Sequence, residues 1–278
     1  MIAACLKWVD LRPEVDASGA VHSDDRFAGV SHADQAALEW ALRQGEASNQ
    51  PVTVLTLGPA GAEQALRAAL ACGATTAVRV DASSSFDSGS VAAALARVVG
   101  KHGATPWIWC GDHSLDRGSA SVPAFLAAEL DLPQALGVVE VRSIDEGLAR
   151  VVRRLDGGRR ERLRLGPGGV VSVEGAAATL RRAGFRASLA ARTAAIDVVP
   201  GPASGGHLHG PTRPYRPRAR VLASPQGATA LERIKVLTVS AGSEATHGEL
   251  VTLEPEAAAA RILAALREWG ELGDGDGT

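Results

Sequence analysis

Residues 51–80 read PVTVLTLGPAGAEQALRAALACGATTAVRV, and this stretch contains one complete strand–helix–strand unit. The β-branched run 52–57 is bounded by proline on one side and Gly-Pro on the other, which predicts a buried strand. Residues 60–71 predict a helix that stops at Gly73. A second, short strand is expected over 77–80, so the segment is the repeating unit of a parallel sheet.

The alternation of strands and helices continues on both sides of this unit. Strands are expected over 2–9 and 105–110, and helices from Ser31 onward, over 88–100 and over 119–130. The Ser31 hydroxyl can accept a hydrogen bond from the backbone N–H three residues later, as a helix N-cap does. Alternation at this spacing requires right-handed crossovers. The first half therefore predicts an α/β fold with a mostly parallel, Rossmann-like sheet.

The second half changes to successive strands. These are expected over 138–141, 149–155, 160–165 and 170–173. The Asp-Gly-Gly triplet at 156–158 is typical of a hairpin turn, so this part of the sheet is predicted to be antiparallel or mixed.

The C-terminal part has a different composition. Residues 176–192 are rich in Ala and Arg and are compatible with a helix, whereas 200–228 are rich in Gly and Pro and predict an extended arm. Beyond the arm we expect a late strand over 234–239, a final helix over 255–269 and a disordered tail over 270–278. The chain is thus divided into an α/β domain with added strands, 1–199, and a C-terminal arm, 200–278.

Composition and charge narrow the class of partner. The chain has 46% hydrophobic and only 4% aromatic residues, with a formal net charge of −2. Nothing in this balance favours nucleic acid or an anionic membrane as a partner. Arginine is dense over 150–164 and 181–192, which is explained either by solvated strand and helix faces or by a docking surface for an acidic partner.

Targeting and cysteine patterns point to a cytoplasmic protein. The first strand carries Lys7 within its apolar run and has no basic leader, so no signal peptide is expected. No stretch approaches the roughly 20 apolar residues that span a bilayer. Cys5, Cys72 and Cys110 show no CxxC spacing, so we expect small buried side chains and neither disulfides nor a zinc site.

Three segments are predicted to meet at the carboxyl edge of the parallel strands, where open α/β sheets bind ligands. They are Leu6-Lys7, the helix start Ser31–Asp34 and the loop Gly111–Gly118. Glycine N–H groups and the following helix N-terminus can hold an anion, although such a loop is also a common structural turn. His113 has no partner that would make it a base, and the His207-x-His209 pair lacks a third metal ligand.

The order of these segments resembles the electron-transfer flavoprotein β subunit family over roughly residues 1–240. The resemblance depends on several short motifs in the family's order and spacing. They are Cys5-Leu6-Lys7-Trp8-Val9-Asp10, Ser31–Leu42, Leu57-Gly58-Pro59 with Ala68–Ala74, Gly111–Val122, Leu132-Pro133-Gln134-Ala135, and the Asp-Gly-Gly hairpin with Gly169–Val173.

The resemblance implies a fold and a set of partners. The fold would be of the adenine-nucleotide α-hydrolase-like type, and the chain would be a non-catalytic electron carrier that pairs with an α subunit. FAD would be held mainly by the α subunit, AMP would bind the β subunit, and a loop near Thr179 to Ala195 would dock a partner dehydrogenase. The residues implied for the nucleotide site are Cys5, Ser31, His32, Ala33, Asp34, Leu57, Gly111, Asp112, His113, Ser114, Leu115, Asp116, Arg117, Gly118, Ser119, Ala120, Ser121 and Val122.

The chain departs from the family at several positions. Asp112 stands where the family has Lys, and a carboxylate repels a phosphate. Ala120-Ser121-Val122 replaces Asn-Gln-Thr, and Ser31-His32 replaces Asn-Pro. These departures count against AMP. The docking segment also lacks the family's L-N-E-P-R-Y pattern, which suggests a partner other than an acyl-CoA dehydrogenase, as in a mycofactocin-associated variant.

Two other functions are compatible with the sequence. The first is a stand-alone adenine-nucleotide-binding protein of the universal-stress type, although the strands and arm after residue 137 count against so compact a binder. The second is a hydrolase that uses Asp112, His113 and Asp116. No GxSxG, HxxxH or HExxH motif supports that reading.

Overall fold

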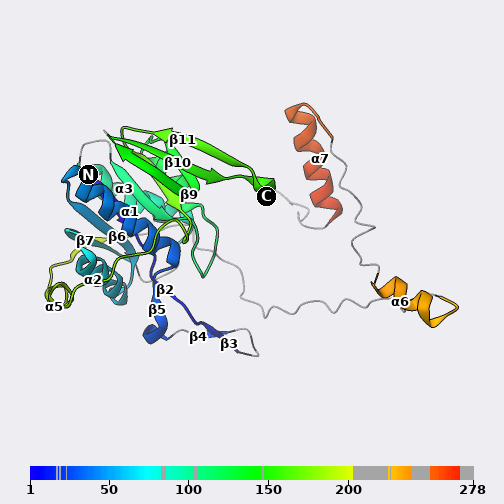
Figure 1. Ribbon diagram of the computed structural model, residues 1–278, viewed down its shortest axis with the longest axis horizontal. Coiled ribbons are helices and arrows are strands. Elements are labelled where there is room, and N and C mark those ends of the chain that lie inside the picture. Colours follow the sequence, from blue (N-terminus) through cyan, green and yellow to red (C-terminus); the bar gives the residue numbers. More distant parts are fainter. Residues whose placement is uncertain are drawn as a thin grey trace, which may run out of the picture. The chain divides into compact units, whose positions relative to one another are not determined.

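The structure is a computed structural model of the 278-residue chain, and it describes residues 1–16, 18, 20–22, 24–82, 86–102, 106–145, 147–202, 225, 227–238 and 251–269. The chain separates into two units, Met1–Tyr215 and Arg216–Thr278, and each is considered by itself. The first unit contains the sheet and the site (Figure 1).

The first unit alternates strands and helices as predicted. Its first half contains β1 (Ile2–Cys5), α1 (His32–Ser48), β6 (Val52–Gly58), α2 (Glu63–Cys72), β7 (Thr76–Asp81), α3 (Ser88–Val99), β8 (Trp107–Gly111) and α4 (Val122–Glu129). Its second half contains β9 (Gln134–Asp145), β10 (Leu148–Arg154), β11 (Arg160–Leu165), β12 (Gly169–Val173), α5 (Phe185–Ala191) and β13 (Asp197–Pro200).

One nine-stranded sheet has the order β11-β10-β9-β12-β8-β1-β6-β7-β13. Every neighbouring pair from β9 to β13 is parallel, and β10 and β11 extend the sheet as antiparallel strands. The chain moves outward from β1 through β6 and β7 and then returns to β8 on the other side of β1. The strand order therefore reverses between β1 and β8, which is where such sheets open a crevice for ligands.

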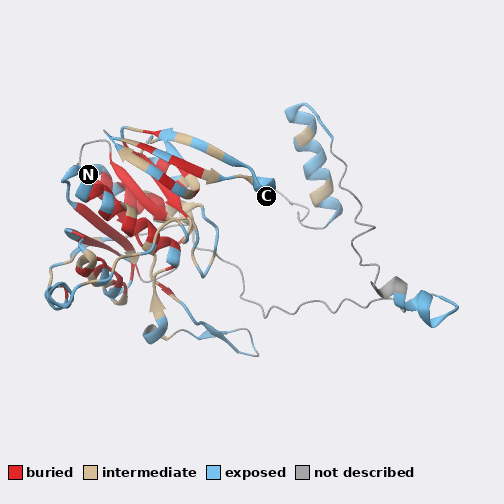
Figure 2. Cartoon of the chain, in the orientation of Figure 1, coloured by how far each residue is buried: buried red, intermediate tan, exposed pale blue. Residues whose placement is uncertain are grey.

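Helices cover both faces of the parallel part (Figures 1 and 2). α1 and α2 pack with alternate strand residues such as Ala4, Val54 and Trp109 in one core. α3 and α4 pack with the intervening residues, such as Ala3 and Ile108, in the other. Both faces of the central strands are thus buried, which explains their nearly continuous apolar sequences.

The predicted hairpin at 156–158 is confirmed. β10 and β11 pair from Ala149↔Leu165 to Arg154↔Arg160, and the N–H of Leu155 donates to the carbonyl of Arg159 at 2.8 Å. Between β1 and α1 the chain forms two small antiparallel ribbons. These pair β2 (Val9–Asp10) with β5 (Ala28–Gly29) and β3 (Glu14–Val15) with β4 (Val21–His22).

Two expectations for the second half need correction, and one strand there was not expected. The late strand over 234–239 is wrong, since the chain there forms helix α6 (Ala230–Thr238). The helix compatible with 176–192 is restricted to α5, because the backbone N–H of Arg181 donates to the Glu39 carboxylate and not to a helical carbonyl. The sequence also missed β13, a short strand that pairs with β7 and ends in proline.

The final helix is confirmed as α7 (Pro255–Glu268). Residues 203–224 and 270–278 lie outside the described residues. The extended arm, the tail and the domain boundary at 199/200 therefore stay predictions.

Candidate functional site

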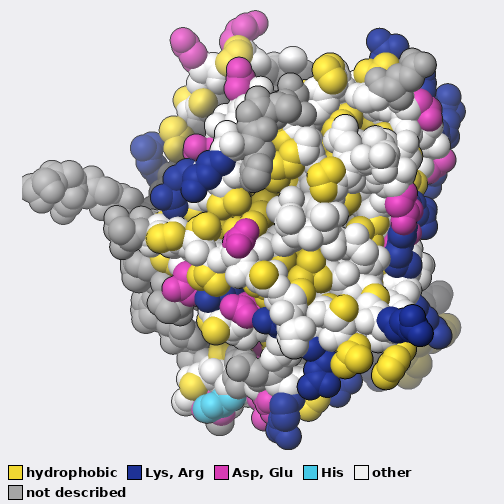
Figure 3. Space-filling model, turned by 90° about the vertical axis from the view of Figure 1, so that its left-hand side faces the viewer, with side chains coloured by type: hydrophobic (Ala, Val, Ile, Leu, Met, Phe, Trp, Pro, Cys, Tyr) yellow, Lys and Arg dark blue, Asp and Glu magenta, His cyan; other side chains and the backbone are white. Residues whose placement is uncertain are grey.

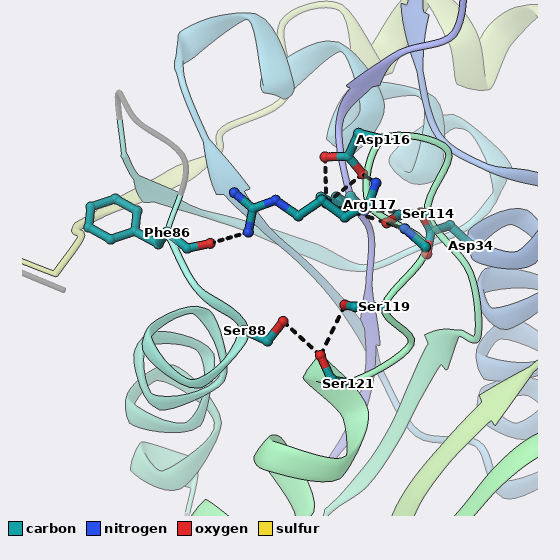
Figure 4. Close-up of polar contacts among 10 residues, drawn as sticks. Asp34, Phe86, Ser88, Ser114, Asp116, Arg117, Ser119 and Ser121 are labelled. Atoms are coloured by element: carbon teal, nitrogen blue, oxygen red, sulfur yellow. Dashed lines mark hydrogen bonds and ion pairs between the residues drawn. The ribbon is translucent and has the colours of Figure 1, made fainter. Parts of the chain in front are cut away.

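A cavity of about 310 Å³ opens at the carboxyl edge of the sheet, where the strand order reverses. The ends of β1, β6 and β8 form its floor, and the first residues of α3 and α4 lie at its rim. The loop that follows β8, residues 112–121, contributes one side of the cavity (Figure 4). The three segments that the sequence placed at this edge all contribute to the cavity wall.

Asp34 is a buried carboxylic acid in the cavity wall. It lies in the first turn of α1, where the Ser31 hydroxyl accepts the Asp34 N–H at 3.0 Å and caps the helix. Its carboxylate accepts the backbone N–H of Lys7 at 3.1 Å. Burial raises the pKa of Asp34 to about 7, because the loss of hydration outweighs the hydrogen bonds from Lys7, Ser31 and Gly111.

Gly111 is the residue of β8 that permits this arrangement. A Cβ atom at position 111 would lie 2.5 Å from Oδ1 of Asp34 and 2.7 Å from its backbone nitrogen. Only glycine therefore lets the end of β8 approach the start of α1 this closely.

An ion pair ties the loop after β8 to the end of β1. Nζ of Lys7 lies 2.7 Å from both carboxylate oxygens of Asp116 and 3.4 Å from the Ser114 hydroxyl. Partial burial raises the pKa of Asp116, but hydrogen bonds from Lys7 and Ser114 outweigh it, so the pKa lies below its ordinary value. Asp112 has the opposite balance, and its pKa is raised by partial burial and by Glu174.

Hydroxyl groups and two helix N-termini gather at the rim. The Ser121 hydroxyl lies 2.8 Å from that of Ser88 at the start of α3 and 3.0 Å from that of Ser119, as Figure 4 shows. Ala120, between the two loop serines, has a φ of 53°, which is unfavourable for a residue with a Cβ atom. Such a turn before a helix directs backbone N–H groups into a concavity and favours an anion.

Arg117 supplies a positive charge to the same rim. Its Nη1 donates to the Phe86 carbonyl at 2.6 Å, which holds the side chain across the opening (Figure 4). The apolar part of the wall is formed by Leu57, Phe86, Val91, Leu95 and Val122. The cavity thus combines an apolar slot with a polar rim, as small-molecule sites do.

Two thiols form part of the floor. Cys5 and Cys110 are paired neighbours on β1 and β8 and are 8% and 4% exposed. A hydrogen bond with Cys5, together with burial, raises the pKa of Cys110 well above its ordinary value. A protonated thiol is a poor nucleophile, so the raised pKa of Cys110 does not favour it as an attacking group.

Comparison with known proteins identifies the family. A family model described as "Electron transfer flavoprotein domain" matches residues 21–204. Protein FixA of Rhizobium meliloti is 33% identical over 205 residues, which cover 67% of this chain and 70% of FixA. The chain belongs to the electron transfer flavoprotein β family. The resemblance found in the sequence is thereby confirmed.

Two further relatives carry that family's name. The electron transfer flavoprotein subunit beta of Thermoanaerobacterium thermosaccharolyticum is 37% identical over 124 residues, or 44% of this chain and 46% of the relative. That of Mycobacterium tuberculosis is 36% identical over 138 residues, or 47% of this chain and 52% of the relative. Each of these two matches spans about half of the relative.

The structure brings most of the predicted site residues of this family member together. The cavity is lined by Cys5, Asp34, Leu57, Gly111, Asp112, His113, Ser114, Asp116, Arg117, Ser119, Ala120, Ser121 and Val122. Five predicted residues do not line it, and they are Ser31, His32, Ala33, Leu115 and Gly118. Ser31 acts indirectly as the cap that orients Asp34.

Sequence reasoning missed further lining residues. They are Leu6, Lys7, Trp8, Gly58, Pro59, Ala82, Phe86, Ser88, Val91, Leu95, Cys110 and Pro123. The sequence predicts Leu6 and Lys7 at the sheet edge but does not include them among the binding residues. The position of Ser88 could have been inferred, because it opens the helix that follows the neighbouring strand β7.

The segment near Thr179 to Ala195 is fixed to the domain on both sides of α5. The Arg181 guanidinium donates to the buried Glu39 carboxylate at 3.0 Å and also pairs with Glu46. After α5, Nη1 of Arg67 donates to the carbonyls of Ala191, Arg192 and Ala194 at 3.1, 3.0 and 3.0 Å. Between these anchors α5 exposes Phe185 and Leu189, which are 84% and 55% accessible.

His207 and His209 lie outside the described residues, and the described ones contain no cluster of His, Cys, Asp or Glu suited to a metal ion. The face of the molecule in Figure 3 mixes apolar side chains with charges of both signs. Among the helices described, none is long and apolar enough to cross a membrane.

Proposed function

We propose that the chain is the β subunit of an electron-transfer flavoprotein. With an α subunit it would hold FAD and carry electrons from a dehydrogenase to a downstream acceptor. Membership of the electron transfer flavoprotein β family supports this role. The single observation that carries it is the cavity where the strand order reverses, which combines an apolar slot with a polar rim that includes Arg117.

The cavity is suited to a mononucleotide. Its volume of about 310 Å³ lies at the lower end of the range for ligand sites, roughly 300–1,000 Å³, which favours a ligand of AMP size over a whole dinucleotide. The rim around Ala120, Ser121 and Arg117 would hold the phosphate, and the apolar slot beside Phe86 and Leu95 would hold the base. FAD would then be held chiefly by the α subunit, near the subunit boundary.

The residues that depart from the family pattern leave the polar rim and the apolar slot of the cavity in place. Asp112 is half-buried beside Glu174, and its burial together with the nearby Glu174 carboxylate raises its pKa above the ordinary value. Asp116 is neutralised by Lys7. Asp34 is half protonated at about pH 7. The pairing of Asp116 and the partial protonation of Asp34 support an anionic ligand despite the acidic residues around the cavity.

The chain's own groups would bind and orient, and we propose no bond-breaking step for them. FAD, when bound, supplies the one- and two-electron chemistry. The segment around α5 would dock the partner dehydrogenase. Its anchors keep Phe185 and Leu189 in a fixed, solvent-facing position, which reduces the entropy lost on binding.

Co-expression with a longer α-type chain encoded nearby tests this function. The expected product is a yellow heterodimer with one chain of each kind and one FAD, measured by absorbance and by mass of the native complex. A colourless, single chain that binds AMP would instead indicate a stand-alone nucleotide-binding protein. Turnover of a substrate by the purified chain alone would contradict the carrier role.

A further inference from the structure

At the outer edge of the sheet, strand β11 exposes both a backbone edge and a row of arginine side chains. β11 is the last strand on its side and pairs only with β10, so one edge of its backbone has no neighbouring strand in the described structure. Its exposed residues Arg160, Arg162 and Arg164 follow one another at alternate positions. Alternate residues of a strand point to the same face, roughly 7 Å apart, so the three guanidinium groups form a row.

The charges on this face are not balanced within the described part of the chain. Arg164 lies directly opposite Arg150, and Arg160 lies directly opposite Arg154. Like charges in such cross-strand pairs are destabilising. Arg150 and Arg154 have carboxylate partners in Asp145 and Glu174.

The three arginines of β11 differ from Arg150 and Arg154 in this respect. Among the described residues, none forms an ion pair with Arg160, Arg162 or Arg164. We call these three residues the arginine row.

The other face of β11 fixes the strand in place. Leu165 is buried and Leu163 packs against the same core as α1. Glu161 is paired with Arg153. The strand is therefore a rigid template, with its backbone edge and the arginine row both directed to solvent.

We propose that β11 accepts an extended acidic segment of a partner protein as an added strand. Backbone hydrogen bonds along the free edge would hold the segment, as in other cases of strand addition. Carboxylates at every second position would lie opposite the arginine row at cross-strand distance. This surface lies on the hairpin formed by β10 and β11, which is a different element of the fold from α5.

Charge and composition favour a protein strand over a nucleic acid. The hairpin 148–165 has no aromatic side chain on which a base could stack. The net charge of the chain is −2, so the basic character is local. A nucleic acid would also leave the free backbone edge of β11 unused.

The probe is a labelled octapeptide that has glutamate at every second position and threonine or valine between. Fluorescence anisotropy measures its binding to the full-length chain. A second peptide of the same composition has its glutamates in one block, and a third has the alternating order but N-methyl groups along one edge. The alternating peptide is expected to bind about tenfold more tightly than either, since only it offers matched carboxylates and a free backbone edge.

Two variants with equal charge change locate the site. Replacing Arg160, Arg162 and Arg164 with glutamine should weaken binding about tenfold and make it less sensitive to salt. Replacing the exposed Arg182, Arg186 and Arg192 with glutamine should leave it unchanged. Because the first variant removes mutual repulsion, it should melt no lower than the wild type.

Amide hydrogen exchange distinguishes strand addition from attraction between charged side chains, because only strand addition protects backbone N–H groups. Bound peptide should slow exchange of β11 backbone amides. Equal binding of the three peptides, an unchanged affinity in the arginine-row variant, or unprotected β11 amides would overturn the proposal. Tighter binding of a single-stranded oligonucleotide at the same residues would overturn it in favour of a nucleic-acid surface.

Discussion

Replacing Asp34 with asparagine tests whether the cavity wall contains a buried, protonated carboxyl group. Burial raises the pKa of Asp34 from its ordinary value of 3.8 to about 7 in the folded chain. The unfolded chain ionises this group near the ordinary value. The contribution of Asp34 to the free energy of unfolding is therefore fully present below about pH 4 and is lost as the pH rises to about 7.

The size of this loss follows from the two pKa values. They differ by about three pH units, and each unit corresponds to 1.36 kcal/mol, so the wild type loses about 4 kcal/mol from this group. Asparagine cannot ionise and keeps an oxygen that can accept the Lys7 N–H. The stability of Asp34→Asn relative to wild type should therefore rise by about 4 kcal/mol between pH 4 and pH 8.

Urea unfolding of both proteins across this pH range measures the difference. The exposed Asp131→Asn variant is the control, because its difference from wild type should not follow the same curve. A constant difference between Asp34→Asn and wild type at every pH would show that Asp34 is ionised in the folded chain. The account of the cavity wall would then be wrong.

Three further substitutions test the elements around the cavity and the docking segment. Lys7→Met should lower the free energy of unfolding by less than about 1 kcal/mol, because the ion pair of Lys7 with Asp116 is partly exposed. Amide hydrogen exchange in the loop after β8 should nevertheless become faster. Unchanged exchange would show that this ion pair does not hold the loop. Arg181→Gln should lower the free energy of unfolding, measured with denaturant, by about 2 kcal/mol, since it leaves the buried Glu39 with one cation fewer. No change in this free energy would show that the contact between Arg181 and Glu39 does not hold the segment in place. Phe185→Ser should leave the melting temperature unchanged but slow reduction of the heterodimer's flavin by the dehydrogenase in stopped flow, and an unaltered rate would remove Phe185 from the docking surface.

The fold was predictable because the local sequence patterns predict the same strands and helices that form the buried sheet and its covering layers. In the first half, proline and glycine mark the ends of the strand 52–57, and the helices α1 and α2 each have an apolar stripe. The Asp-Gly-Gly triplet fixed the hairpin between β10 and β11. These features depend on neighbours in the sequence and need no knowledge of long-range contacts.

The expected late strand shows how a local signal can be misread. Residues 234–239 are rich in β-branched side chains, which predicts a strand. A capping box just before them starts a helix instead. The Thr229 hydroxyl accepts the Glu232 N–H at 3.2 Å, and the Glu232 carboxylate accepts the Thr229 N–H at 3.1 Å. The Thr-x-x-Glu pattern was present in the sequence and outweighs the β propensity.

The site was only partly predictable. The loop after β8 could be placed at the sheet edge from strand order alone. The burial of Asp34 could not, because it depends on Gly111 of a strand that is 77 residues away in the sequence. Arg181 likewise needed the tertiary structure, since its partner Glu39 lies on α1. Contacts of this range leave no pattern in a single sequence.

The nucleotide content of the purified heterodimer tests the central claim most directly. Denaturing the complex and quantifying the released nucleotides by chromatography should yield one FAD and one AMP per heterodimer. A Ser121→Asp variant, which adds a carboxylate to the rim, should release FAD but no AMP. Release of FAD alone from the unmodified heterodimer would contradict a mononucleotide in the cavity, and joint loss of FAD and AMP in the variant would contradict two separate sites.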